Sequence, residues 1–529
     1  MPAADSSRPR WIERPLPVAI ACLALAWLAY GPSLDNGFYN DDALFLNHAA
    51  RAVADPAALW HERPLNYFRP VWSAWVTAQW TLFGRDARGY HAVGILLHAA
   101  TGLLVWLLAR RLLRGVPGGA TAALVSAAAF VLLFAHAEGT LWIAAHNSVL
   151  AAALCVAAVL AHLAAVDAAA KPGQGLTRAT GRAALTAVLV LAALLTKEPA
   201  VVVLAWLPLV ELCVAGPRSL LRPAAWARGA AVAAAVAVFL AGNARIGEAF
   251  ADPSEGGAAN EIRATFGFIT ADKLLGATAW MFSPLAHAHD AARWWHGALV
   301  LGAIAALLAW RRRDLLGPAL CAMALLLTAM APAAMTRFQQ ANGSRLYYFP
   351  TVGAALLLGL VCVALAGRRP RAAALVVALL FASLGAWNLL SIRALNADDY
   401  GPIGVTQTRL AEQLGELLPR AGPHAVVLCE PWIGNLMHLQ EFVRLYADVP
   451  PARVRRQSVP REDFPAWLAR QRQLDPGVHL LDWDEQRGLV PAVSAPPQRN
   501  DSPGMPRREA ELPAAPRVAI LRIEPPAER

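Results

Sequence analysis

The sequence has few charged residues. Only 16% of its 529 residues are charged, whereas 57% are hydrophobic, and the mean hydropathy is +0.41. A soluble globular domain usually has about 25% charged residues. The composition therefore excludes an ordinary soluble domain and predicts a polytopic membrane protein.

The cysteines follow no metal-binding spacing. There are six, and no pair forms a CxxC motif: Cys22, Cys155, Cys213, Cys321, Cys362 and Cys429. Five of them fall inside apolar runs, which predicts small buried side chains rather than ligands or a disulfide framework.

The chain also lacks a signal-peptide cleavage site and a nucleic-acid binding stripe. The apolar run 16–30 is followed by Gly-Pro-Ser-Leu-Asp, with no small-x-small motif, so we interpret it as a retained first helix. The formal net charge is +10. Its Arg residues gather in short clusters between apolar runs, which is typical of topology signals, and no basic stripe with interleaved aromatics occurs. We expect no nucleic acid partner.

Apolar runs long enough to cross a bilayer recur along the first three quarters of the chain. They predict an all-α membrane domain over residues 1–394 with about eleven transmembrane helices. The predicted spans are 15–31, 91–109, 119–137, 146–166, 182–196, 199–215, 226–243, 297–310, 315–333, 346–366 and 372–391.

The Arg and Lys clusters indicate the orientation. With this set of spans, all six clusters fall on one side of the membrane, which the positive-inside rule assigns to the cytoplasm. We therefore expect a cytoplasmic N-terminus. The opposite face receives the loop 32–90, for which aromatic residues at near-helical spacing predict interfacial helices. The segment 270–285 is short and is interrupted by Pro284, so we interpret it as an interfacial or re-entrant helix.

The composition changes sharply after Ser391. Residues 395–529 contain polar helical patterns at 405–418 and 461–473, and strand-like runs at 424–429, 478–482 and 517–523. They predict a small soluble C-terminal α/β domain on the extracytoplasmic side. Its Pro-rich segment 491–515 is typical of a disordered linker.

Polar residues fall at the outer ends of several predicted helices, where charge is costly unless it is used. Asp41 and Asp42 follow the first helix, and this adjacent pair suits either an acid/base or metal site or the capping of a helix that begins at Ala43. Lys197 and Glu198 could form part of a cavity or a mutual salt bridge. Arg345 could bind a lipid phosphate or be solvated in its loop.

Five motifs occur in an order that resembles a known family. They are Asn36-Gly37-Phe38-Tyr39-Asn40-Asp41-Asp42, Phe68-Arg69-Pro70-Val71, the Gly89–Ala99 segment that includes His91, Thr196-Lys197-Glu198, and the Ser344–Gly353 segment that begins Ser-Arg-Leu-Tyr-Tyr. Together they resemble bacterial relatives of the transmembrane-and-tetratricopeptide-repeat O-mannosyltransferases. Those enzymes belong to the GT-C superfamily of polyprenyl-phosphate-sugar-dependent glycosyltransferases. The likeness extends over residues 15–391.

The resemblance implies a membrane hexosyltransferase. Its partners would be a polyprenyl-phosphate-linked monosaccharide, a protein or glycan acceptor with a free hydroxyl, and the surrounding membrane lipid. The sugar carbon would be inverted. Asp41 would match the general base, and Asp42 would orient the acceptor or help to hold a divalent cation, although the sequence leaves the need for a cofactor open. The resemblance implies that Lys197, Arg345 and Arg69 stabilise the leaving phosphate and that Tyr347 or Tyr348 hydrogen-bonds it. The other candidate substrate-binding residues, which lie at the outer helix ends, are His91, His146 and Glu198. No residue is assigned as a metal ligand.

The chain departs from the family pattern at two points. Ser344 stands where an acidic residue often precedes the Arg-Tyr pair, and the repeat array that would present a protein acceptor is missing. A transporter or flippase of lipid-linked sugars and a non-catalytic membrane scaffold are the alternative functions. Because Ala and Arg are abundant, we expect a bacterial protein in the cell inner membrane with its site on the periplasmic face.

Overall fold

The computed structural model of the protein forms two compact units. It describes residues 13–170, 176–251, 269–282, 294–335, 344–366, 371–421, 426–429, 439–447, 453–460, 469–470, 473, 479–484, 488–491 and 517–524. The first unit comprises residues 1–35 and 48–400, and the second comprises residues 36–47 and 401–529. The chain passes from the first unit to the second after residue 35, returns to the first within the helix Asp42–Ala54 at residue 48, and enters the second again at residue 401.

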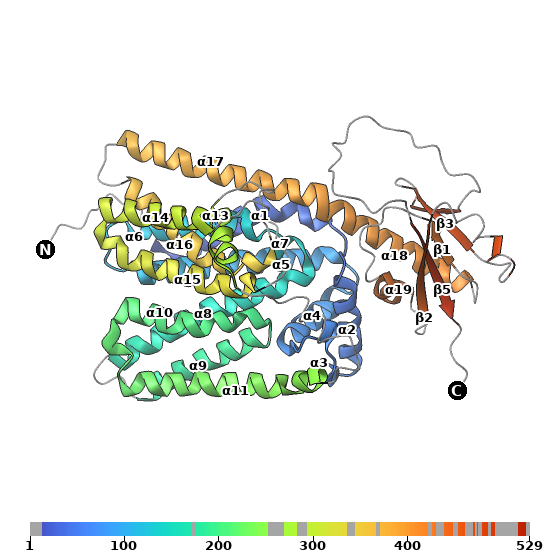
Figure 1. The fold of residues 1–529 in the computed structure, drawn as a ribbon, viewed down its shortest axis with the longest axis horizontal. Helices are drawn as coiled ribbons and strands as arrows, with labels where there is room; N and C mark the ends of the chain where they lie inside the picture. The colour runs from blue at the N-terminus through green and yellow to red at the C-terminus, as the bar shows by residue number, and fades with distance from the viewer. Residues whose placement is uncertain are drawn as a thin grey trace. The chain divides into compact units, whose positions relative to one another are not determined.

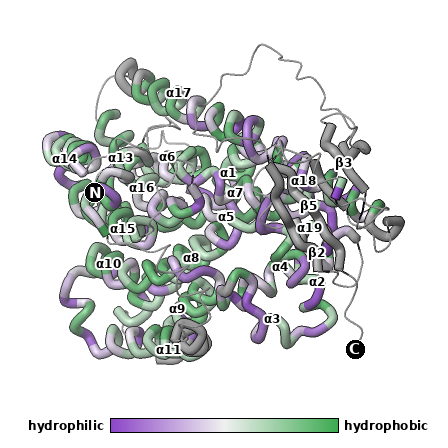
Figure 2. Tube along the Cα trace, turned by 45° about the vertical axis from the view of Figure 1, so that its right-hand side comes forward, coloured by the Kyte–Doolittle hydropathy of each residue, from purple (hydrophilic) through white to green (hydrophobic). Residues whose placement is uncertain are grey.

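The first unit is a bundle of apolar helices (Figure 1). Its longer helices are α1 (Pro15–Tyr30), α5 (Ala87–Leu112), α6 (Gly119–Leu132), α8 (His146–Ala170), α9 (Leu176–Leu194), α10 (Val203–Ala215), α11 (Pro223–Ala251), α14 (Trp294–Arg311), α15 (Leu316–Ala334), α16 (Pro350–Ala366) and α17 (Arg371–Leu395). Helix α8 packs against α5, α9 and α10, while α16 packs against α6 and α15. Figure 2 shows that hydrophobic residues cover much of these helices.

This unit makes the chain a multi-pass membrane protein. In the described part of the chain, eight helices are long and apolar enough to cross a membrane. Three shorter apolar helices accompany them, at Gly119–Leu132, Thr180–Leu194 and Pro350–Ala366. A helix lies in every one of the predicted spans. Large apolar side chains such as Leu299 and Leu379 are exposed on the helices, which suits contact with lipid.

Small residues allow the helices to approach closely. A Cβ atom added at Gly359 on α16 would lie 2.3 Å from the Ala122 carbonyl oxygen of α6, and one at Gly353 would lie 2.6 Å from that of Ala322 on α15. Close backbone approach at Gly and Ala is the usual way in which membrane helices associate, because lipid tails remove the hydrophobic drive between helices.

The long loop after α1 is largely helical. It contains α2 (Asp42–Ala54), α3 (Ala58–His61) and α4 (Pro70–Phe83), as the aromatic spacing predicted. Of the predicted segment 270–285, the structure describes residues 270–282, which contain the π-helical turn η8 (Asp272–Gly276) and the short helix α13 (Ala277–Met281). It is not among the helices of the described chain that are long enough to span the bilayer. The irregular turns that matter below are η4 (Phe134–His136), α7 (Glu138–Leu141), η6 (Glu198–Val202) and η10 (Arg345–Tyr347).

A buried charged cluster ties three helices of the first unit together. Glu211 of α10 accepts one hydrogen bond from Arg228 Nη2 of α11 at 2.5 Å and pairs with His162 Nε2 of α8 at 2.8 Å. All three side chains are at least nine-tenths buried. Because each member has a partner of opposite or neutral charge, the cluster can remain inside an apolar bundle.

The second unit contains a five-stranded mixed sheet and two helices. The helices are α18 (Gly401–Ala421) and α19 (Leu439–Ala447). The sheet has the order β2-β5-β1-β3-β4, with β1 (Val426–Cys429) parallel to β3 (His479–Asp484) and antiparallel to β5 (Arg517–Glu524). The edge strands β2 (Arg453–Pro460) and β4 (Gly488–Pro491) lie outside the predicted strand-like runs. Most of the predicted helix 461–473 and of the Pro-rich segment 491–515 lies outside the described residues.

Candidate functional site

A narrow pocket in the first unit combines two basic side chains with an apolar wall. Its lining comes from the start of α8, the turns before η6 and at η10, and the end of α15. The residues are Ser148, Lys197, Pro199, Ala329, Pro332, Ala333, Arg345, Leu346 and Phe349. Two of the sequence-predicted site residues, Lys197 and Arg345, are therefore brought together although 148 positions separate them in the sequence.

The chain places Lys197 by ending one helix just before it. The amide of Lys197 still donates to the Ala193 carbonyl at 3.0 Å, but Pro199 cannot donate and the next turn is the 3-10 helix η6. The Lys197 side chain then turns toward the start of α8. Its Nζ donates to Asn147 Oδ1 at 2.8 Å and to Ser148 Oγ at 2.5 Å.

The partners of Lys197 are neutral, and the side chain is only 6% exposed. Burial, followed by the charges of Arg345 and Arg69, holds the Lys197 pKa well below its usual range, while Glu198 and Glu138 act in the opposite direction. An anion entering the pocket would favour the charged amine.

Arg345 is held in place by a carboxylate and an indole ring. Its backbone amide donates to Glu138 Oε2 at 2.7 Å, and its Nη1 donates to Glu138 Oε1 at 2.6 Å. The guanidinium lies over the Trp142 ring, with its carbon 4.4 Å from the ring centroid. Ser344 caps the turn through a hydrogen bond from the Leu346 amide. The acidic partner of this arginine therefore comes from α7, far away in the sequence.

Arg69 and Glu198 form a pair of their own. Arg69 Nη2 donates to Glu198 Oε2 at 2.6 Å, and Arg69 also stacks on Tyr67 at 3.9 Å. Neither residue lines the pocket. Glu198 thus pairs with Arg69, while Lys197 is bound by α8. The Arg69–Glu198 pair flanks the candidate site as a neutral unit and affects Lys197 through its charges.

The predicted histidine and tyrosine residues lie in the packed interior beside this region. His91 and His146 are buried, and their rings are packed edge to face with centroids 6.4 Å apart. The Tyr348 hydroxyl lies 2.5 Å from His98 Nδ1. Tyr347 is buried as well. None of these predicted residues lines the pocket described above.

Asp41 and Asp42 belong to the second unit, where they begin helix α2. The Asp41 carbonyl accepts hydrogen bonds from the amides of Leu44 and Phe45, so Asp41 occupies the N-cap position. The Asp42 carboxylate accepts a hydrogen bond from the Tyr39 amide at 2.8 Å. Asp42 is buried, whereas Asp41 is half-buried.

A metal would find an incomplete ligand set among these residues. Within the described parts of the chain, no three His, Cys, Asp or Glu side chains come together as a metal site. Oxygen-rich sites for divalent ions usually need several carboxylate or carbonyl ligands.

The sequence predicted the two cations and placed Glu138 and Asn147 among the polar residues at the outer helix ends, but it missed Ser148 and the pairing of Glu138 with Arg345. No sequence pattern marks Ser148 as a partner of Lys197 or Glu138 as a partner of Arg345, because a single serine or glutamate at a helix end is common. The one usable clue was their position at an outer-facing helix end within the predicted topology, where charge is costly.

Comparisons with known proteins gave structural matches only. No family model matches the chain, and no curated protein matches it. An apo oligosaccharyltransferase from Archaeoglobus fulgidus matches with a TM-score of 0.48 and 11% identity over 84% of this chain. The same archaeal enzyme, AglB, in complex with an inhibitory peptide and a dolichol-phosphate matches with a TM-score of 0.48 and 12% identity over 82% of the chain.

The chain spans about three fifths of the length of these archaeal structures, 61% and 63% respectively. ArnT from Cupriavidus metallidurans in the apo state matches with a TM-score of 0.47 and 15% identity, over 82% of this chain and 84% of that one. All these TM-scores are below 0.5, so the functional assignment of this chain rests on its own residues.

Proposed function

We propose that this protein is a GT-C-type glycosyltransferase. It transfers a monosaccharide, with mannose as the first candidate, from a polyprenyl-phosphate donor to a hydroxyl of a protein or glycan acceptor. The reaction takes place on the periplasmic face of the inner membrane and inverts the sugar carbon. The five sequence motifs support this proposal, and the pocket that joins Lys197 and Arg345 carries it.

The pocket has the chemistry of a lipid-phosphate site. A guanidinium and an ammonium can bind phosphate oxygens with charge-assisted hydrogen bonds, and Ser148 adds a hydroxyl. The wall of Ala329, Pro332 and Phe349 offers apolar surface to the first isoprene units. A water-soluble anion would gain nothing from that wall.

The proposed displacement needs a base and a stabilised leaving group. The Asp41 carboxylate takes the proton from the acceptor hydroxyl, whose oxygen attacks the anomeric carbon from the side opposite the phosphate. The bond between that carbon and the phosphate oxygen breaks, and the phosphate leaves with the electron pair. Lys197 and Arg345 stabilise the added negative charge of the polyprenyl phosphate. Asp42 keeps the Asp41 turn in shape through its hydrogen bond from the Tyr39 amide.

The proposed topology completes the assignment. About eleven transmembrane helices place the N-terminus in the cytoplasm, because the Arg and Lys clusters then share one side. Residues 36–47 and the C-terminal region form a soluble extracytoplasmic α/β domain. Arg69, His91, His146, Glu198, Tyr347 and Tyr348 support the substrate site from around the two cations.

The test uses purified protein and a short-chain polyprenyl phosphomannose, with release of polyprenyl phosphate and labelling of periplasmic acceptors as readouts. Asp41→Asn should lower transfer by about 10²–10⁴-fold, the usual contribution of a general base. Its thermal stability should stay near that of the wild type, because Asn caps a helix as well as Asp does. Asp35→Asn is the matched control. Asp35 is exposed and pairs only loosely with Arg88, at 3.3 Å.

The alternatives predict different results. A flippase would move the labelled lipid across proteoliposomes without releasing phosphate, and a scaffold would do neither. Transfer that survives Asp41→Asn at the wild-type rate would remove Asp41 from the mechanism. Absence of transfer by the wild type with every polyprenyl-phosphate sugar and periplasmic acceptor tried would contradict the proposed function.

A further inference from the structure

The loop that carries Asp41 is packed against the C-terminal part of the chain. Residues 36–47 belong to the same compact unit as residues 401–529, although about 370 positions separate the contacting residues. Sequence patterns alone assign no role to the C-terminal region. Its contacts with this loop therefore need an explanation.

Gln407 of α18 holds the residue next to Asp41 at two points. The Asn40 amide donates to Gln407 Oε1 at 2.8 Å, and Gln407 Nε2 donates back to Asn40 Oδ1 at 3.2 Å. Asn40 has a φ of 45°, in the left-handed region that Asn tolerates better than most residues. Gln407 is itself 3% exposed. A buried side chain thus fixes an unusual backbone conformation directly before the proposed base.

A second contact holds the start of the same loop. The Phe38 amide donates to Thr408 Oγ1 at 2.8 Å. A Cβ atom added at Gly37 would lie 2.3 Å from Thr408 Oγ1 and 2.4 Å from the Gly404 carbonyl oxygen. Only glycine fits at position 37, because the loop backbone lies directly on α18.

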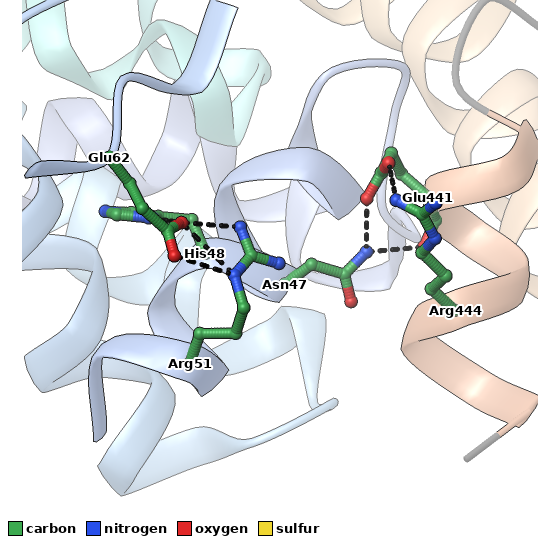
Figure 3. Close-up of polar contacts among 6 residues, drawn as sticks. All are labelled: Asn47, His48, Arg51, Glu62, Glu441 and Arg444. Carbon is green, nitrogen blue, oxygen red and sulfur yellow. Dashed lines mark hydrogen bonds and ion pairs between the residues drawn. The ribbon is translucent and has the colours of Figure 1, made fainter. Parts of the chain in front are cut away.

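Helix α18 is in turn anchored in its own unit. It packs against α19, where a Cβ atom added at Gly415 would lie 2.8 Å from the Tyr446 carbonyl oxygen. Figure 3 shows the other end of the loop: the Asn47 amide group donates to the Glu441 carbonyl at 2.7 Å and to its carboxylate at 2.9 Å. Arg444 pairs with the same carboxylate. Two helices of the C-terminal region therefore hold both ends of the segment that contains Asp41.

A general base on a loop needs such contacts, because they limit how far the base can move from its reactive position. Catalytic groups must be kept within about 0.5 Å of their productive position, and loops are less precise than helices. A displacement of about 1 Å can cost about 10²-fold in rate.

We propose that α18 is a positioning element for catalysis, in which Gln407 and Thr408 hold residues 37–40 so that Asp41 faces the acceptor hydroxyl. This inference rests on the proposed function. Gln407 and Thr408 touch the loop backbone and the Asn40 side chain, not the substrate, so they are positioning residues. The C-terminal domain is then part of the transferase rather than an appended binding module.

The test compares matched substitutions on one helix in the full-length protein. Thr408→Val removes the hydroxyl with little change in shape, Thr408→Ser restores it, and Thr406→Val makes the first change two residues away on α18. Gln407→Leu removes both contacts to Asn40. The readouts are the kcat and KM for transfer, the affinity for polyprenyl phosphate, and hydrogen exchange of the peptide covering residues 36–47.

We expect Gln407→Leu to lower kcat by about 10- to 100-fold. Thr408→Val should cause a smaller loss that Thr408→Ser recovers, and Thr406→Val should behave as the wild type. Hydrogen exchange of residues 36–47 should rise in the damaged variants, while polyprenyl-phosphate affinity stays within about twofold, because the lipid-phosphate pocket is built from the other unit. In an Asp41→Asn background, Gln407→Leu should cause no further loss.

Two results would overturn the inference. The first is that Gln407→Leu and Thr408→Val keep the wild-type kcat although Asp41→Asn is inactive. In that case the proposed function would stand without the positioning role of α18. The second is an equal loss of kcat and polyprenyl-phosphate affinity, which would indicate a general folding defect. Inactivity of the wild type would instead remove the proposed function and this inference with it. If Gln407→Leu fails to fold, the Thr408 series decides.

Discussion

Two buried charged sites lie toward opposite ends of α8, and they are built in different ways. Near its end, His162 joins Glu211 and Arg228 in a cluster whose carboxylate has both oxygens occupied. At its start, Asn147 and Ser148 bind the Lys197 amine. The first site pairs its charge with the opposite charge, whereas the second leaves a buried cation among neutral groups.

The difference supports the proposed ligand site at Lys197. Burying an ion costs several kcal/mol unless other groups compensate its charge. The Glu211 cluster is compensated from within, so it serves to hold α8, α10 and α11 together. Lys197 is compensated only in part, and the nearby Arg345 opposes it. A site of this kind is completed by an anion, which is the physical basis of the proposed phosphate pocket.

The largest expected effect is on stability, at the Glu211 cluster. Glu211→Leu leaves the Arg228 charge buried without its carboxylate, so the variant should lose about 3–5 kcal/mol of stability. Unfolding in mixed detergent micelles measures this loss. The double variant Glu211→Leu/Arg228→Met removes both charges and should recover much of it. A single variant as stable as the wild type would show that this cluster is not a structural tie.

Lys197→Met should lower the transfer activity and leave the stability intact. Transfer should fall by about 100-fold, because a charged partner of the leaving phosphate is lost. The thermal midpoint should stay equal to that of the wild type or rise, because a poorly compensated buried charge has been removed. Activity assays and thermal unfolding in detergent measure the two quantities. A large loss of stability in this variant would place Lys197 in the same class as Glu211.

The pH dependence of phosphate binding sharpens the contrast. The Lys197 pKa is held well below its usual range by burial and by Arg345 and Arg69, against the opposing effect of Glu198 and Glu138. A bound anion raises the Lys197 pKa. When the pH is above the Lys197 pKa of the ligand-free protein, binding of the anion is therefore accompanied by uptake of a proton. The affinity for a non-reactive polyprenyl phosphodiester, whose own charge does not change in this range, should therefore fall by up to about tenfold per pH unit.

Isothermal titration calorimetry in buffers of different ionisation enthalpy measures this proton uptake. Lys197→Met provides the control and should bind with an affinity that does not depend on pH in this way. The ligand-free protein should also depend on pH. Between the Lys197 pKa of the folded state and that of the unfolded state, the Lys197 amine is protonated only when the chain is unfolded, so the stability should rise with pH in this range. Affinity that does not change with pH in the wild type would mean that Lys197 does not meet the phosphate.

The smallest effect is expected for Arg345→Lys. The charge is kept, but the planar group over Trp142 and the fixed contact with Glu138 are weakened. Transfer should fall by about fivefold, mainly through KM, as steady-state kinetics would show. Arg345→Met, which also removes the charge, should be clearly worse. Equal losses in both variants would mean that the shape of the guanidinium matters more than its charge.

The sequence predicted features that depend on local patterns. Runs of apolar residues placed a helix in each predicted span, and the motif order selected Lys197 and Arg345, which the structure brings to one pocket. It also indicated helices in the loop after α1. These features follow from periodicity and composition, which act over a few turns of chain.

Features that depend on distant partners could not be predicted. Glu138 reaches Arg345 across 207 positions, and Gln407 reaches Asn40 across 367. No short pattern marks a glutamine on a polar helix as the partner of a loop near the N-terminus. The Glu211 cluster was missed for the same reason, because hydropathy shows that a charge lies in an apolar run but not which residue compensates it. Strand β2 was missed because its Arg-rich sequence has little apolar alternation.

The most direct test of the account is an experimental structure of the protein with polyprenyl phosphate bound. The account predicts phosphate density within hydrogen-bonding distance of both Lys197 Nζ and the Arg345 guanidinium, with the isoprenoid chain along Ala329, Pro332 and Phe349. Phosphate density at another site, with Lys197 still bound only to Asn147 and Ser148, would contradict it.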